Sequence, residues 1–406
     1  MKSLNQKSLI CLSLVGSLAS LNAAPLASLG DDVALFVTGS ARATYQDNLF
    51  RLNDDSDAHD ADANEDYALV FTPGLELQLA DSSTLKSQLN ASVAITRYSK
   101  SENDGLDSEL PSISLNTNYS SGITNIVTKA SWREQASNSS EFVDINPGVE
   151  ELQGRLIEIE TTDLSALGTY NFSDRTSVRS GATYQRRIYP GLSLVGNRSV
   201  SVPLTFLYEV RPLTQLTATY RYRNTETQNN TFSNSYDDHN FSVGVEGEVL
   251  IPTLTGSASI GYQVREADQG RDTDNFSFDA GLSYILTPKA TISLNASRDF
   301  RNSAVSSTVN GQRIASTIIG TRVGLSGVYT LNSMHRMVGG LTYANSDYED
   351  YDRSQDSVYA NIGYRYTPND YWTFGATYNY EITDGSGINY RDYDSNRLSV
   401  SAALRY

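Results

Sequence analysis

The 406-residue sequence has little of several residue types: one Cys, three Met, two Trp and three His. Cys11 lies in an N-terminal segment with the features of an export signal, so we expect neither a disulfide nor a thiol nucleophile in the mature chain. His59, His239 and His335 do not have the spacing of zinc ligands. Positive charge is also scarce, with 31 Lys and Arg against 47 Asp and Glu and a formal net charge of −16. This imbalance argues against nucleic-acid binding, which requires a basic surface.

The sequence has only one long apolar run, Leu9–Leu21, and small polar residues interrupt it. A membrane-spanning helix needs about 20 apolar residues, so we predict none. Lys2 and Lys7 precede the run and small residues follow it, which is the pattern of a secretory signal peptide. We therefore predict a signal peptide over residues 1–23 and a mature domain over residues 24–406.

Catalytic motifs are lacking as well. The sequence has no nucleotide-binding loop, no G-x-S-x-G elbow and no evident pair of catalytic carboxylates. His239 follows Asp237 and Asp238, a neighbourhood similar to that of rim-sited outer-membrane proteases, but any acidic link produces it by chance. We expect neither enzymatic activity nor a cofactor.

What the sequence does contain is a two-residue alternation of apolar and polar side chains from Val33 to Tyr406. It runs in segments of about 9 to 13 residues, separated by Gly, Pro, Asn, Asp and Ser, as is typical of β-strands. In the clearest segment, Trp372 to Ile382, the even positions are aromatic or aliphatic and the odd positions are Thr, Gly, Asn or Glu. Such a strand has one apolar face and one polar face.

The connections between these segments alternate between short turns and long links, and we count about 18 strands. Residues 224–239 and 301–316 are two of the nine long links that we predict. Strict alternation in an even number of strands is typical of bacterial outer-membrane barrels. A bilayer admits strands only as a closed ring with an apolar exterior, because the hydrocarbon contains no water for unpaired backbone groups. We therefore predict an all-β fold: one transmembrane up-and-down antiparallel barrel with short periplasmic turns and long acidic extracellular loops. Sixteen strands is the alternative, because residues 112–119 and 151–172 alternate less cleanly.

The end of the chain agrees with this prediction. Leu398, Val400, Ala402, Leu404 and Tyr406 alternate up to a terminal aromatic residue, like the C-terminal strand signal of the barrel assembly machinery. The 26 Tyr suit aromatic girdles at the two membrane interfaces. We expect a Gram-negative outer-membrane location, with lipids, lipopolysaccharide and the assembly machinery as partners.

Charged residues at inward positions of the predicted strands are candidates for lining the lumen and setting its selectivity. These are Arg42, Arg133, Arg179, Arg221, Arg223, Arg265, Arg322, Arg365, Glu246 and Glu381. Facing charges of both signs can filter solutes by charge and size. The alternative is that they pair with neighbours on adjacent strands and only keep the lumen wet.

Acidic residues concentrate in the long links, above all in the first one. Asp55, Asp57, Asp60 and Asp62 offer oxygen ligands for Ca²⁺, but the segment lacks the Gly and the terminal Glu of an EF-hand loop. We favour a solvated anionic loop, bridged loosely by divalent ions to lipopolysaccharide phosphates.

Residues 41–51, read as Ala-Arg-Ala-Thr-Tyr-Gln-Asp-Asn-Leu-Phe-Arg, precede the Asp-rich link. This segment resembles the opening of the β-barrel porin 2 family, which often has a Tyr-Asp-Asp-Asn-Ile-Phe-Arg-like stretch, although Gln46 stands where that family often has Asp. The resemblance implies an outer-membrane barrel, in some lineages associated with exopolysaccharide export loci.

The expected function is a channel for the passive passage of hydrophilic solutes or for the export of a polysaccharide, with an export partner in the second case. The different class that we consider is a structural or adhesive barrel, which acts through its acidic loops and has a plugged lumen. Barrels of 16 to 18 strands leave an aqueous channel, which favours the first reading.

Overall fold

The computed structural model describes residues 25–30, 33–53, 64–81, 84–136, 157–190, 194–229, 233–269, 271–309, 312–350, 352–387 and 392–406. The predicted signal peptide lies outside these residues. Within them, no helix is long and apolar enough to span a membrane.

The described chain is almost entirely strand. The strands are β1 (Ala27–Leu29), β2 (Val33–Gln46), β3 (Asp66–Asp81), β4 (Leu85–Tyr98), β5 (Ser108–Ser120), β6 (Thr124–Ala136), β7 (Glu158–Asn171), β8 (Thr176–Ile188), β9 (Gly196–Arg211), β10 (Thr214–Gln228), β11 (Ser233–Glu248), β12 (Leu254–Ala267), β13 (Thr273–Thr287), β14 (Ala290–Val309), β15 (Gln312–Thr330), β16 (His335–Tyr348), β17 (Arg353–Tyr366), β18 (Trp372–Gly387) and β19 (Tyr393–Arg405). A short 3₁₀ helix, η2 (Ser101–Leu106), lies between β4 and β5.

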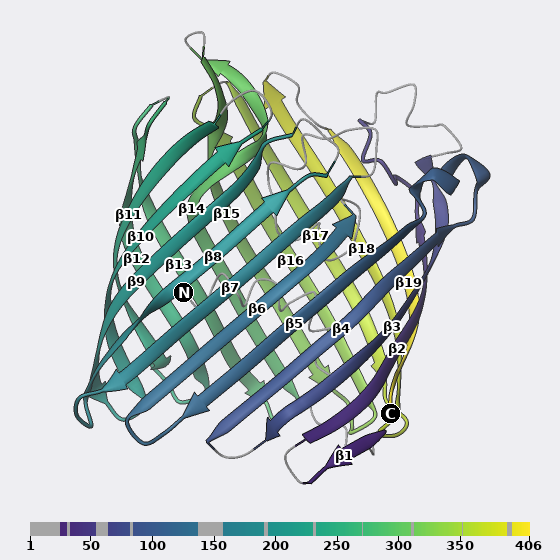
Figure 1. The fold of residues 1–406 in the computed structure, drawn as a ribbon, viewed down its shortest axis with the longest axis horizontal. Coiled ribbons are helices and arrows are strands. Elements are labelled where there is room, and N and C mark those ends of the chain that lie inside the picture. The colour runs from purple at the N-terminus through teal and green to yellow at the C-terminus, as the bar shows by residue number, and fades with distance from the viewer. Residues whose placement is uncertain are drawn as a thin grey trace.

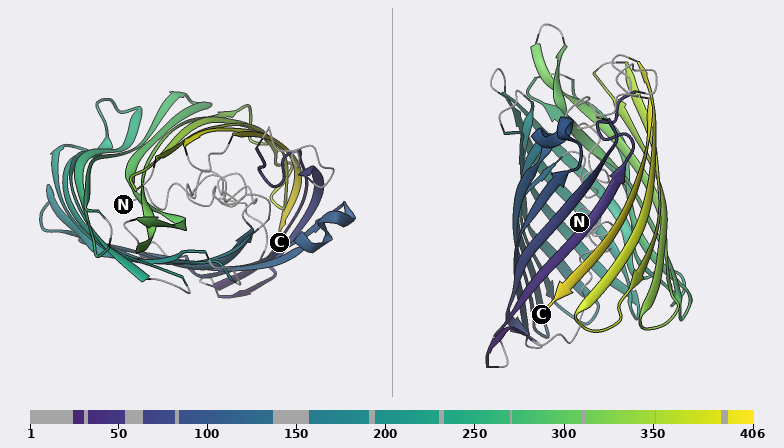
Figure 2. Two further views of the ribbon diagram at one scale, coloured as in Figure 1. Left: turned by 90° about the horizontal axis from the view of Figure 1, so that it is seen from above. Right: turned by 90° about the vertical axis from the view of Figure 1, so that its right-hand side faces the viewer.

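Strands β2 to β19 form one closed ring in which every strand pairs antiparallel with its sequence neighbours and β19 pairs with β2. Figure 1 shows these strands tilted around the barrel, and Figure 2 shows from above that the wall is oval. The predicted barrel of 18 strands is therefore confirmed. The short β1, which pairs with β2, is an addition that the alternation did not predict.

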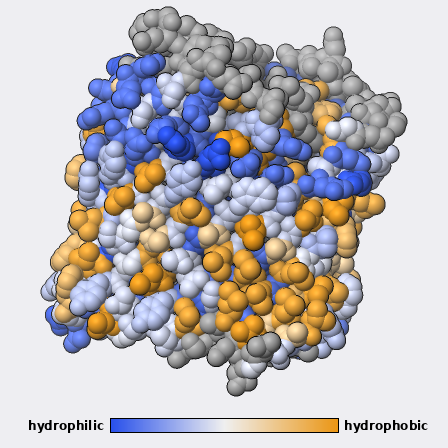
Figure 3. All heavy atoms as spheres, viewed as in Figure 1, coloured by the Kyte–Doolittle hydropathy of each residue, from blue (hydrophilic) through white to orange (hydrophobic). Residues whose placement is uncertain are grey.

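The two faces of the wall differ as the alternation predicts. Large apolar side chains at alternate positions are exposed on the outside, for example Leu204 at 53%, Val243 at 60% and Ile260 at 58%. Their neighbours on the same strands, such as Thr205 and Gln263, are buried on the inner face. Figure 3 shows the apolar side chains gathered over the lower part of one face, with polar side chains above them. A closed wall with an apolar exterior is the arrangement that a bilayer requires.

Two of the predicted long links are wrong in extent. Residues 224–239 were expected to form a link, but β10 continues to Gln228 and β11 starts at Ser233. Residues 301–316 were also expected to form a link, but β14 and β15 stay paired to Val309 and Gln312. Above the hydrocarbon both faces of a hairpin can be wet, so polar residues on both faces do not end the strand pairing.

The seam between β19 and β2 is joined by side chains as well as by the backbone ladder. Thr44 Oγ1 and Ser399 Oγ lie 3.1 Å apart on the inner face. Nearer the short turns, Arg405 Nη2 donates to Glu76 Oε1 over 2.7 Å, and its guanidinium lies 3.7 Å from the ring centroid of Phe36. These contacts hold the last strand of the wall against its first two.

Candidate functional site

The ten charged residues predicted to line the lumen all lie on strand positions opposite to the exposed apolar side chains, and so on the inner face. They are Arg42, Arg133, Arg179, Arg221, Arg223, Arg265, Arg322, Arg365, Glu246 and Glu381. The structure brings three of them into one cluster, joins Arg179 to Glu246, and places the others elsewhere on the wall. Their role in selectivity stays a prediction.

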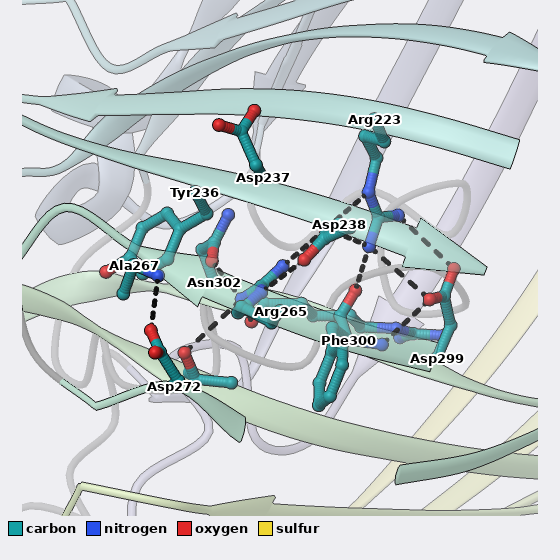
Figure 4. Close-up of polar contacts among 12 residues, drawn as sticks. Arg223, Tyr236, Asp237, Asp238, Arg265, Ala267, Asp272, Asp299, Phe300 and Asn302 are labelled. Carbon is teal, nitrogen blue, oxygen red and sulfur yellow. Dashed lines mark hydrogen bonds and ion pairs between the residues drawn. The ribbon is translucent and has the colours of Figure 1, made fainter. Parts of the chain in front are cut away.

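The cluster joins three arginines and two aspartates on β10, β11, β12 and β14 (Figure 4). Arg223 Nε donates to Asp238 Oδ2 at 2.8 Å, and Arg265 donates to both oxygens of Asp238 at 2.7 and 2.9 Å. Arg221 and Arg223 each donate to Asp299 Oδ2 at 3.2 Å. The Arg265 and Asp238 side chains are 1% and 4% exposed, whereas Asp299 keeps 23%. The cluster carries one net positive charge and its outermost part faces the lumen.

Beside this cluster, the extended ends of β14 and β15 leave the wall. The last residue of β14 paired with β13 is Arg298, and β15 pairs with β16 only from Ile318 onwards. Residues 299–309 therefore pair only with β15 and residues 312–317 pair only with β14, and we call these two segments the inner hairpin. Seen from above, the green ribbon of this hairpin lies inside the outline of the barrel (Figure 2).

Side chains on the inner face of β11 and β12 hold the inner hairpin. Arg265 Nη1 donates to Asn302 Oδ1 at 2.7 Å and to Thr317 Oγ1 at 3.3 Å. Tyr236 donates through its hydroxyl to the Ala315 carbonyl at 2.5 Å. The Arg265 guanidinium also lies 4.8 Å from the ring centroid of Tyr236. Because these anchors are buried, the hairpin is fixed against the wall and narrows the lumen on this side.

A second anchor lies on the opposite edge of the hairpin. Asp350, in the link after β16, accepts hydrogen bonds from the Ser316 hydroxyl and the Thr317 backbone N–H, both at 2.9 Å. Phe300 and Ile318, at the root of the hairpin, are almost fully buried. The hairpin is thus held from two sides of the barrel.

The remaining predicted residues form smaller contacts. Arg179 on β8 donates to Glu246 on β11 at 3.0 Å, although two strands separate them, so the wall curves tightly here. Arg133 lies 3.7 Å from Asp163. The alternative considered from the sequence was that the inward charges form ion pairs with neighbours on adjacent strands. Ion pairing therefore accounts for some of the ten predicted residues.

At the extracellular side of the seam, Glu381 is shared between two strands and a link. It accepts from Arg51 Nη2 at 3.3 Å and from the Tyr393 hydroxyl at 2.7 Å. Gln46 Oε1 accepts from Arg397 Nη2 at 2.8 Å nearby. Three basic side chains and one carboxylate thus lie in this part of the lumen, since the charge of Arg42 also acts on Arg397.

Sequence reasoning did not single out Asp238, Tyr236 or the anchoring Asp350. It grouped Asp238 with His239, but the alternation places them on opposite faces. His239 Nδ1 is 2.8 Å from the Tyr220 hydroxyl on the outside, while Asp238 points inward to arginines. The neighbourhood similar to a protease site is therefore not formed.

The weak calcium candidates, Asp55, Asp57, Asp60 and Asp62, lie outside the described residues. Among the residues that the structure describes, no group of three or more His, Cys, Asp or Glu could hold a metal ion.

The closed ring, the apolar exterior and the polar lumen define a porin-like outer-membrane β-barrel. Residues 249–406 match the family model described as "Putative beta-barrel porin 2". The predicted resemblance is thus confirmed over β12 to β19, a different part of the chain from the segment that suggested it. No curated protein matches the chain in sequence.

Solved structures resemble the chain only distantly. OpdO from Pseudomonas aeruginosa is 14% identical with a TM-score of 0.49, over 92% of this chain and 98% of that one. The siderophore receptor PirA from Acinetobacter baumannii is 7% identical with a TM-score of 0.45, over 94% of this chain and 81% of that one.

Proposed function

We propose that this barrel is a channel, without catalytic activity, through which hydrophilic solutes pass passively or a polysaccharide is exported. The observation that carries the proposal is the polar inner face of a closed wall of 18 strands. Barrels of 16 to 18 strands enclose an aqueous channel, whereas smaller ones are filled by their own side chains. The inner Ser, Thr, Asn and Arg side chains offer hydrogen-bond partners to hydroxylated solutes.

The inner hairpin is the proposed constriction, and the cluster beside it is the proposed charge filter. Arg221 and Arg223 are 15% and 14% exposed, so they border the aqueous space that the hairpin narrows. Three arginines against two aspartates give this point a positive bias. Fixed charges lining a narrow pore select ions by sign.

The test is single-channel recording of the purified, refolded protein in planar bilayers, with reversal potentials measured in a salt gradient. We expect steady openings in the wild type. Replacing Arg221 and Arg223 by Ala removes two positive charges from the cluster, so the reversal potential should shift towards cations. A barrel that is folded by circular dichroism and heat-modifiable electrophoresis but never conducts would overturn the proposal and would favour a plugged barrel that acts through its loops.

The control replaces two arginines on the outer face instead. Arg97 and Arg198 are each paired with a carboxylate, Glu109 and Glu226, and lie outside the lumen. Replacing both by Ala changes the net charge equally and should leave the reversal potential unchanged. An equal shift in both double variants would show that the cluster is not the filter.

The export route is part of the same proposal. Residues 1–23 act as a signal peptide, and the strand that ends at Tyr406 presents the assembly signal. The mass of the protein extracted from outer membranes should correspond to a chain starting at residue 24. Retention of the first 23 residues in a correctly inserted barrel would contradict this assignment.

A further inference from the structure

Two arginines face each other on the outer surface of the barrel, near the extracellular end of one hairpin. Arg186 is the third residue from the end of β8, Arg198 is the third residue of β9, and the two are directly paired. Both are exposed, whereas Ser177 on β8 and Ser201 on β9, which lie an odd number of residues away, are buried on the inner face. We call Arg186 and Arg198 the outward arginine pair.

The outward arginine pair lies where the apolar exterior of these two strands ends. On β9 every second residue from Val210 to Val200 is a large apolar or aromatic side chain exposed on the outside, and Arg198 is the next residue in that series. On β8, Tyr184 lies one step closer to the membrane than Arg186 and pairs with Val200. Aromatic residues at the edge of the apolar band mark the membrane–water interface. The pair is therefore placed at the level of the lipid headgroups.

The pairing of two like charges sets this place apart from the rest of the outer face. Like charges directly opposite each other in a sheet repel, so the pairing costs stability. Elsewhere on the extracellular half of the outer face, the structure joins complementary groups. Arg97 on β4 donates to Glu109 on β5 at 2.7 Å, and Tyr222 on β10 donates to Asp237 on β11 at 2.6 Å. The arginine pair therefore favours an anionic ligand from outside the chain.

One carboxylate, Glu226 on β10, balances only half of the charge. Arg198 donates to Glu226 Oε2 through Nε, at 2.8 Å, and through Nη2. The side chain of Arg186 forms no ion pair or hydrogen bond with any other residue in the described part of the chain. On β7, Glu160 pairs with Ile188, one step further from the membrane than the arginines. An anion that approaches from the membrane side therefore meets the arginines first.

The geometry suits a phosphate group. The β-carbons of an opposed pair are about 5 Å apart, so two guanidinium groups can reach the oxygens of one phosphate. Guanidinium groups bind phosphate by paired, charge-assisted hydrogen bonds. Thr162 on β7 pairs with Arg186 on its other side and places a hydroxyl beside it.

The surface below the pair suits the acyl chains of a lipid. Leu164 on β7 pairs with Tyr184, which pairs with Val200, and Leu164 and Val200 are exposed. A lipid whose phosphate is bound by the arginines lays its chains along these residues. A free phosphate ion gains nothing from them, so the surroundings favour a lipid.

We propose that the outward arginine pair binds a phosphate group of a phosphorylated glycolipid of the lipid A type in the outer leaflet. The inference goes beyond the proposed channel function and does not depend on it, because the pair lies on the outer face and has no part in the lumen. Bound lipid balances the repulsion between the two arginines and fixes the height of this hairpin in the membrane.

The experiment titrates the full, detergent-solubilised barrel with diphosphoryl lipid A and measures the bound fraction by native mass spectrometry. Replacing Arg186 and Arg198 by Gln should raise the dissociation constant about tenfold, which corresponds to ~1.4 kcal/mol. Lipid A from which both phosphates have been removed should bind equally weakly to the wild type and to the Gln variant.

A matched control removes two other outward arginines. Arg97 pairs with Asp107, and Arg298 pairs with Phe278 and Thr321, so neither faces a second basic residue. Replacing Arg97 and Arg298 by Gln removes the same charge from the same face and should leave the dissociation constant unchanged. Heat-modifiable electrophoresis verifies that each variant is folded. If the double Gln variant does not fold, Arg186→Gln alone is the test and should also weaken binding.

Three results would overturn the proposal. The first is equal affinity of the wild type and the Gln variant for diphosphoryl lipid A. The second is an equal loss of affinity in the control variant, which would show that net charge alone attracts the lipid. The third is equally tight binding of inorganic phosphate, which would assign the pair to a free ion instead of a lipid. A barrel that does not conduct would refute the channel and leave this inference intact, so the two failures are distinguishable.

Discussion

Replacing Arg265 by Ala should release the inner hairpin from the wall. Arg265 is fully buried and is the residue that joins Asp238, Asn302 and Thr317. Removing one partner of a buried ion pair costs about 3 to 5 kcal/mol. Because Arg223 continues to face Asp238, we expect the lower end, about 3 kcal/mol.

The lost free energy weakens the contact between the inner hairpin and the wall. The backbone hydrogen bonds of the barrel are unaffected, because they do not involve the Arg265 side chain. Lowering the opening free energy by about 3 kcal/mol should speed amide exchange in residues 299–317 by about a hundredfold. Hydrogen exchange followed by mass spectrometry of that peptide measures it. The single-channel conductance should rise in the same variant, because the hairpin no longer narrows the lumen at a fixed position.

Arg298 provides the control. It lies on the outer face of β14, just before the hairpin, where it contacts Thr321 and Asn275. Replacing it by Ala removes the same side chain from the same strand without touching the anchor. Two results would refute the assignment of Arg265 as the anchor. In the first, amide exchange and conductance stay at wild-type values in the Arg265 variant. In the second, they change equally in the Arg265 and Arg298 variants.

Three further predictions concern the wall and the rim. Leu204→Arg places a charge on the lipid-facing surface and should destabilise the barrel by about 2 to 4 kcal/mol near the mid-plane, measured by denaturant unfolding in lipid vesicles. Gly256 has φ +138°, and a β-carbon there would lie 2.0 Å from a carbonyl oxygen, so Gly256→Ala should lower the melting temperature of the barrel. Gly327 has open space around it, so Gly327→Ala should leave the melting temperature unchanged. Hydrogen bonding by the Lys100 ammonium holds the pKa of the Glu65 carboxyl below its usual range. The contact between Lys100 and Glu65 is therefore present at neutral pH and is lost as the pH falls through the lowered pKa of Glu65. Pepsin should then cut the adjoining η2 segment more readily the further the pH lies below that pKa. Glu65→Gln should expose the same segment to proteases at pH 7.

Much of the wall could be predicted from the sequence, because one physical requirement governs it. In the hydrocarbon region every strand needs an apolar outer face, and the alternation in β18, from Trp372 to Ile382, records that requirement residue by residue. The same alternation placed Arg223 and Arg265 on the inner face. Eighteen strands followed from counting such segments.

The inner hairpin could not be predicted in this way. Above the bilayer no apolar face is required, so β14 carries Asn302 and Ser303 where a strand in lipid would carry a large apolar residue. The adjacent Ile318 and Ile319 are both buried, which breaks the alternation because the hairpin root packs on two sides. Two successive buried apolar residues were a signal for this packing, but only the fold shows that the adjoining hairpin is anchored to side chains of β11 and β12.

The seam bears on the order in which the wall can be completed. Thr44 and Ser399 touch across the seam although 355 residues separate them in the chain. All other neighbouring strands of the ring are consecutive in sequence and need only a hairpin to pair. Bringing such distant segments together carries the largest loop-closure entropy in the molecule, and contacts of long sequence separation slow folding. Until β19 reaches β2, both strands have an unpaired edge, so the seam is the natural place for an assembly factor to hold the growing sheet open and for aggregation to begin when it does not.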